Sequence, residues 1–168
     1  MIETATTCYI PVETLRNFMK DVLLAAGVPE ADAETCTDVI IMSDIRGIES
    51  HGIGRLKYYY DRIKAGQHKV VTEIEVVREG PTTAVLDGHH GMGMVVARKA
   101  MQMAIEKARM YGMGSVAVRN STHFGIAGYY PLMAVKEGMV GFTVTNARPS
   151  VAPTFGVQPM LGTNPIAF

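Results

Sequence analysis

The pattern of the sequence changes at Gly66, and this change constrains the fold more than any other feature. Before it, apolar residues recur at the three- and four-residue spacing of amphipathic helices. Three helical stretches end near Gly27, Gly47 and Gly66, in keeping with the preference for glycine after a helix. After Gly66, short β-branched runs alternate with helical patterns. We therefore expect an α/β chain, with a helical N-terminal segment at 1–66 and a mixed α/β core at 67–168.

Individual elements follow from the same spacing. The third helix is predicted over about 53–65, with four side chains turned inward, at Leu56, Tyr59, Tyr60 and Ile63. In the core, strands are predicted at 74–78, 83–86, 115–118 and 139–145, and helices at 94–111 and 126–136. The strand at 115–118 is expected to be buried.

The composition excludes several classes of protein. Lys plus Arg equals Asp plus Glu, at 16 each, so no bulk field attracts nucleic acid or an anionic membrane. The sequence contains no run of 18 apolar residues and no signal-peptide pattern at its start. Cys8 and Cys36 lack metal-binding or redox spacing, which indicates reduced thiols and a cytoplasmic protein.

The end of the sequence is unusual for a domain. The last residue is Phe168, in the middle of an apolar pattern, whereas domains more often end on a polar, frayed tail. We therefore expect this chain to be a fragment of a longer protein, with its core truncated at the C-terminus.

The segment 43–56, SDIRGIESHGIGRL, concentrates groups suited to chemistry. His51 can exchange a proton near neutral pH, and the Ser50 hydroxyl is adjacent to it. Arg55 can bind a carboxylate through two parallel hydrogen bonds. Glycines around these residues let the backbone approach a ligand closely. The segment therefore predicts acid/base chemistry on a small anionic substrate.

Polar loops follow two of the predicted strands. The stretch 120–125, NSTHFG, comes directly after one strand, and 145–149, TNARP, follows the next. Ligands commonly bind beyond the carboxyl ends of strands in α/β sheets, so these loops and 162–165, GTNP, indicate a shared crevice. The alternative is that Asn120 and Ser121 only satisfy backbone groups in a turn, and spacing alone leaves both interpretations open.

Other motifs are absent or incomplete. The glycines at 91 and 93 do not complete a dinucleotide-binding G-x-G-x-x-G, because position 96 is Val96. No phosphate-binding P-loop and no G-x-S-x-G nucleophile motif occur. The histidines show no metal-ligand spacing, so no metal site is predicted. His68 is expected to be solvated, and His89 and His90 to be surface groups.

Taken together, these loops resemble the malate/L-lactate dehydrogenase family, which lacks a Rossmann fold. The matching stretches are SDIRGIESHGIGRL, VRNSTHFGIAGYY and TNARPSVAPTFGVQPMLGTNPIAF, in that order, from about Val12 to Phe168. The resemblance implies NAD- or NADP-dependent hydride transfer between a 2-hydroxy acid and its 2-oxo form. It also implies a nucleotide-binding core peculiar to this family and a homodimer.

The resemblance assigns roles residue by residue. His51 and His123 are acid/base candidates, with Ser50 beside His51, and members of the family differ over which histidine moves the proton. Arg55 and Thr163 match substrate-binding positions. Six residues match positions that line the cofactor cleft: Asn120, Phe124, Gly125, Asn146, Ala147 and Asn164. Two alternatives are a reductase of cyclic imino acids on the same scaffold and an inactive fragment that serves only folding or dimerisation.

Overall fold

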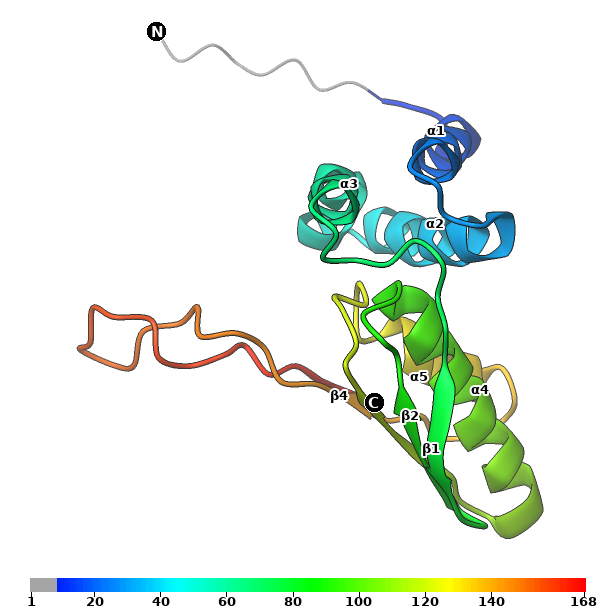
Figure 1. Ribbon diagram of the computed structural model, residues 1–168. Coiled ribbons are helices and arrows are strands. Elements are labelled where there is room, and N and C mark those ends of the chain that lie inside the picture. The colour runs from blue at the N-terminus through cyan, green and yellow to red at the C-terminus, as the bar shows by residue number, and fades with distance from the viewer. Residues whose placement is uncertain (1–8) are drawn as a thin grey trace, which may run out of the picture.

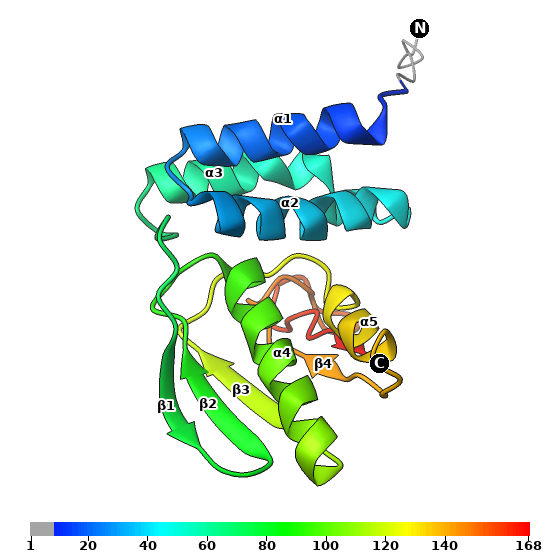
Figure 2. The same ribbon diagram turned by 90° about the vertical axis from the view of Figure 1, so that its right-hand side faces the viewer.

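The N-terminal helices form one layer, which lies across the end of the α/β core (Figure 1). The computed structural model describes residues 9–168, so the predicted thiol at Cys8 lies outside the described residues. Three helices, α1 (Val12–Ala25), α2 (Glu30–Ile45) and α3 (Leu56–Lys64), lie side by side (Figure 2). Short 3₁₀ helices at Glu49–His51 and Ile53–Arg55 connect α2 to α3. The predicted helices are confirmed to within a few residues.

An apolar core joins the three helices to the start of α4 (Gly93–Tyr111). It is built from fully buried side chains that include Met19, Leu23, Val39, Ile40 and Tyr59. The inward prediction for Tyr60 was wrong, because its side chain is 38% exposed. Leu56, Tyr59 and Ile63 share the buried stripe of α3, and Tyr60 lies at the margin of that stripe.

The core begins with a three-stranded sheet in the order β1-β2-β3. Strand β1 (Glu75–Glu79) pairs antiparallel with β2 (Thr83–Asp87), and β2 pairs parallel with β3 (Ser115–Arg119). Helix α4 (Gly93–Tyr111) connects β2 to β3 and covers one face of the sheet (Figure 2). Gly112 ends this helix in the left-handed conformation, with φ of +83°.

Strand β3 is half-exposed rather than buried. Val116 and Val118 pack under α4, while Ser115, Ala117 and Arg119 are exposed. The prediction of a buried strand was wrong because, among the described residues, only one face of β3 is covered and only its β2 edge is paired.

The last part of the chain has little regular structure. Helix α5 (Tyr129–Val135) is shorter than predicted, because the three residues before it form a turn closed by Tyr129 N–H and the Ile126 carbonyl. Strand β4 (Thr143–Val144) is also shorter, since its partner β5 (Ile166–Ala167) has only two residues. Between them, 147–165 projects from the body as an extended arm (Figure 1). No helix in residues 9–168 is long and apolar enough to cross a membrane.

Candidate active site

The loop 49–55 is fixed against the end of α2 by one carboxylate. Asp44 Oδ2 accepts a hydrogen bond of 2.8 Å from the Ile53 N–H. A Cβ atom at Gly52 would lie 1.7 Å from Asp44 Oδ1, so a larger residue fits here only if the carboxylate or the loop moves. The tight contact sets the two 3₁₀ turns that hold His51 and Arg55.

Ser50, His51 and Arg55 are joined within this loop. Ser50 Oγ lies 2.9 Å from His51 Nδ1, and Arg55 Nε donates to the Ser50 carbonyl at 2.7 Å. The His51 side chain is half-buried, and its burial, together with the positive charge of Arg55, lowers its pKa. The predicted base and the predicted carboxylate-binding group therefore share one side of the loop.

The loop after β3 brings His123 onto His51. Their rings stack with centroids 5.5 Å apart and planes inclined by 26°. His123 Nδ1 lies 2.8 Å from the Tyr59 hydroxyl and 3.2 Å from the Gly125 backbone nitrogen. Burial, followed by the nearby positive charges of His51 and Arg55, lowers the pKa of His123 to about 4. The ring is therefore neutral at pH 7.

Three aromatic residues of the cluster around His123 were not predicted as site residues. Tyr58 and Tyr59 lie against its ring, at centroid distances of 5.8 and 5.7 Å, and His68 packs against both tyrosines. Tyr59 follows Arg55 by four residues, so helical spacing could have placed it on the same face. No sequence signal marks His68, which lies in a turn.

The prediction of a solvated His68 was wrong. The residue is 5% exposed, and its Nδ1 has no hydrogen-bond partner within residues 9–168. Burial against the two tyrosines and the charge of Arg62 lower its pKa to about 4. His90 is exposed as predicted, while His89 is partly buried and within 3.0 Å of the Glu75 carboxylate.

A groove of about 1250 Å³ runs between α4, β3, α5 and β4. Small and apolar residues of these elements line most of it. Its polar groups include Thr145, Asn146 and Asn164, and the predicted cofactor residue Phe124 also lines it. Asn164 Oδ1 accepts a hydrogen bond of 2.9 Å from the Ala147 N–H, which ties the two predicted loops together. The exposed Thr163 is next to this contact.

Three predicted cofactor residues, Asn120, Gly125 and Ala147, do not line the groove. Asn120 donates through Nδ2 to Asp87 Oδ2 at 2.8 Å, and its backbone is left-handed, with φ of +50°. Asp87 is buried and also accepts from the His89 N–H and from Arg119 Nε; these hydrogen bonds, the His89 one foremost, lower its pKa to about 2. Gly125 is buried beneath His123.

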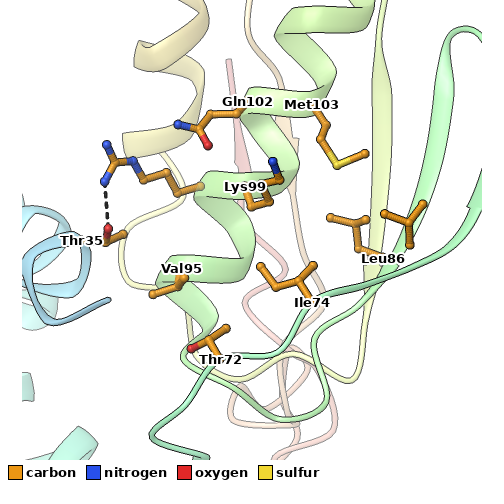
Figure 3. Close-up of a pocket in the computed structure, with 10 residues that line it drawn as sticks. Thr35, Thr72, Ile74, Leu86, Val95, Lys99, Gln102 and Met103 are labelled. Atoms are coloured by element: carbon orange, nitrogen blue, oxygen red, sulfur yellow. Dashed lines mark hydrogen bonds between the residues drawn. The ribbon is translucent and has the colours of Figure 1, made fainter. Parts of the chain in front are cut away.

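A second hollow, of about 350 Å³, lies between α2, β1 and α4 (Figure 3). Arg98 Nη1 donates to Thr35 Oγ1 at 2.8 Å across it, and Ile74, Leu86 and Met103 form an apolar wall. None of the predicted site residues lines this hollow. In residues 9–168, no three His, Cys, Asp or Glu side chains lie close enough together to hold a metal ion.

Comparison with known proteins identifies the family of the chain. The family model described as malate/L-lactate dehydrogenase matches residues 10–168. The chain belongs to the malate/L-lactate dehydrogenase family. It is 57% identical over 158 residues to a malate dehydrogenase of Pyrococcus abyssi, a match that covers 94% of this chain and 44% of the relative.

Two further relatives support the assignment to this family. An L-sulfolactate dehydrogenase of Methanocaldococcus jannaschii is 48% identical over 155 residues, covering 92% of this chain and 45% of the relative. The solved malate dehydrogenase of Pyrococcus horikoshii OT3 superposes with a TM-score of 0.91 and 50% identity, over 95% of this chain and 46% of that one. The mixed α/β fold with N-terminal helices is therefore the fold of this family. The chain spans less than half the length of the relatives it matches.

Proposed function

We propose that this chain carries part of the active site of a nicotinamide-dependent 2-hydroxy acid dehydrogenase. The observation that supports it most is the stacking of His51 on His123, from two distant segments, with Arg55 beside them. The names of the relatives, malate and sulfolactate dehydrogenase, agree with a substrate that carries a hydroxyl next to a carboxylate. The reaction interconverts this 2-hydroxy acid and its 2-oxo form.

The side chains divide the chemistry among them. His51 accepts the proton of the substrate hydroxyl, and the Ser50 hydroxyl orients its ring through Nδ1. Arg55 binds the substrate carboxylate through its terminal nitrogens, since its Nε is already bound to the Ser50 carbonyl. Thr163 is a further substrate contact. His123, with a pKa of about 4, is a weak proton acceptor at pH 7 and better suited to binding the substrate oxygen.

The groove fits one part of a nicotinamide cofactor. Its polar end presents the amides of Asn146 and Asn164 and the Thr145 hydroxyl, which suit a ring that carries a carboxamide. Phe124 also lines the groove, and Ala147 is held next to it by the hydrogen bond from its N–H to Asn164 Oδ1. Asn120 and Gly125 fix the loop that carries His123. Among the residues that line the groove none is charged, so the described chain offers no cation there for a pyrophosphate. When bound, NAD or NADP supplies the hydride acceptor.

The assembly is a homodimer in the cytoplasm. The arm 147–165 exposes Phe155 and Val157 almost completely, and a second copy of the chain would cover such apolar groups. Cys36 is a buried free thiol, which suits a reducing compartment.

The test combines cofactor binding and turnover. We expect the 168-residue chain to quench or enhance the fluorescence of NADH or NADPH. Oxidation of the reduced cofactor with oxaloacetate, pyruvate or sulfopyruvate is measured with a longer version of the chain that spans the length of its relatives. The P. abyssi malate dehydrogenase is the positive control. Turnover with cyclic imines and none with 2-oxo acids would favour the imine reductase. If neither cofactor binding nor turnover is observed, the result would favour the alternative of an inactive fragment that serves only folding or dimerisation.

A further inference from the structure

The Tyr59 hydroxyl is a buried polar group for which the proposed function has no use. Tyr59 lies on α3 with no exposed surface, yet its hydroxyl reaches across to His123 Nδ1, on the loop after β3, at 2.8 Å. The contact joins the helical layer to the α/β core at the ring that stacks on His51. Because the Tyr59 side chain is fully buried on a helix, its hydroxyl has little freedom to move away from its hydrogen-bond partner.

The direction of this hydrogen bond follows from a second contact of the same atom. The Gly125 backbone N–H points at His123 Nδ1 from 3.2 Å, and a backbone N–H can only donate. Nδ1 therefore carries a lone pair, and the Tyr59 hydroxyl must donate to it as well. In a neutral imidazole the hydrogen is then on Nε2, on the side of the ring remote from Tyr59.

His51 has no such constraint. Its Nδ1 is bound to the Ser50 hydroxyl, which can donate or accept. His51 can therefore present either an N–H or a lone pair at Nε2, as a group that exchanges protons must. The two stacked rings differ in this respect although both are imidazoles.

We propose that Tyr59 is a positioning residue that fixes His123 as the neutral ring protonated on Nε2, the form that donates a hydrogen bond to a substrate oxygen. The donation of a hydrogen bond to substrate rests on the proposed function, whereas the assignment of the Nε2-protonated tautomer of His123 does not. Burial raises the pKa of Tyr59 well above its usual range, so the hydroxyl keeps its proton at neutral pH.

The experiment is nitrogen NMR of the 168-residue chain labelled with ¹⁵N-histidine at pH 7.5. His123 is expected to show a protonated Nε2 and an unprotonated Nδ1. In Tyr59→Phe, Nδ1 loses a donor and its resonance should move towards that of a free, unprotonated ring nitrogen. Tyr60→Phe, the same change at an exposed neighbour on the same helix, should leave it unchanged.

Two results would overturn the proposal. One is a proton on Nδ1 of the unsubstituted chain, a measurement that does not depend on any variant folding. The other is an Nδ1 resonance that does not respond to Tyr59→Phe. Addition of oxamate, an analogue of a 2-oxo acid, separately tests the donor role, because a bound oxygen should shift the Nε2–H proton. If oxamate does not shift the Nε2–H proton, the result would count against the proposed function but not against the assigned tautomer of His123.

Discussion

The imidazole rings of His51 and His123 are stacked 5.5 Å apart, although they come from opposite sides of the boundary at Gly66. His51 belongs to a loop fixed by Asp44, and His123 to a loop fixed by Tyr59 and Gly125. Because each ring is held by its own segment, the site depends on how the helical layer sits on the core.

Replacing His51 tests the proposal that it is the proton acceptor. His51→Ala should lower kcat by about a hundredfold to ten-thousandfold, the usual contribution of general acid/base catalysis. Turnover of the 2-oxo acid identified in the substrate screen is the measurement. His123→Ala should lower kcat less, because a hydrogen-bond donor is lost and the base remains. His90→Ala, at an exposed loop position, is the control, and a His51 variant as active as this control would remove His51 from the role.

Replacing Arg55 by lysine tests carboxylate binding. A point charge cannot reproduce the planar fork of a guanidinium, so Arg55→Lys should raise KM for the acid and leave kcat close to that of the parent. Steady-state kinetics separates the two constants. The same change at the exposed Arg78 on β1 should alter neither. An unchanged KM in Arg55→Lys would argue against contact with the carboxylate.

Acidification should destabilise the junction between the two layers in a defined pH range. The pKa values of His68 and His123 fall from 6.5 to about 4 on folding, so below pH 6.5 the unfolded chain binds more protons than the folded chain. The stabilisation is complete above pH 6.5 and is lost progressively down to pH 4. Arg55 and Arg62 add to the cost of charging these rings, since they raise the local positive charge.

Thermal unfolding between pH 7.5 and 4 measures this effect. His68→Phe should flatten the fall in Tm over that range. It removes a pH-dependent contribution to the free energy of unfolding that is of the order of 1 kcal/mol after solvent screening. His90→Asn, at an exposed position, should leave the slope unchanged. Asp87 acts in a separate range, because its lowered pKa costs stability only as pH falls from 3.8 to about 2. An equal slope in the parent and in His68→Phe would contradict the prediction.

The sequence was sufficient to locate most of the helices and strands, and the failures have physical causes. Periodicity located α1 to α4 and β1 to β3, because each element has a single apolar stripe or alternating face. The predicted burial was wrong for His68, which is buried, and for β3, which is half-exposed, because burial there depends on partners distant in the chain. Glycine spacing suggested that His51 is exposed to a ligand, but no local pattern could show that His123 stacks on it.

The fit between Gly52 and Asp44 gives a prediction about folding of the site loop. A methyl group at position 52 would overlap the Asp44 carboxylate, so Gly52→Ala must displace the carboxylate or the loop. We expect a loss of about 1–3 kcal/mol in the free energy of unfolding, the usual cost of overpacking. Urea unfolding of the parent and the variant measures it.

Gly54→Ala is the matched control in the same loop, because its new Cβ would meet only the Glu49 carbonyl, at an ordinary 3.9 Å. It should change stability little. If the contact with Asp44 causes the loss, the cost of Gly52→Ala should shrink in an Asp44→Ala background, since the overlapping group is then gone. Asp44→Ala alone leaves the Ile53 N–H without its acceptor, so the double-mutant cycle separates this effect from the steric one. Equal costs of Gly52→Ala in both backgrounds would show that the carboxylate does not constrain the loop.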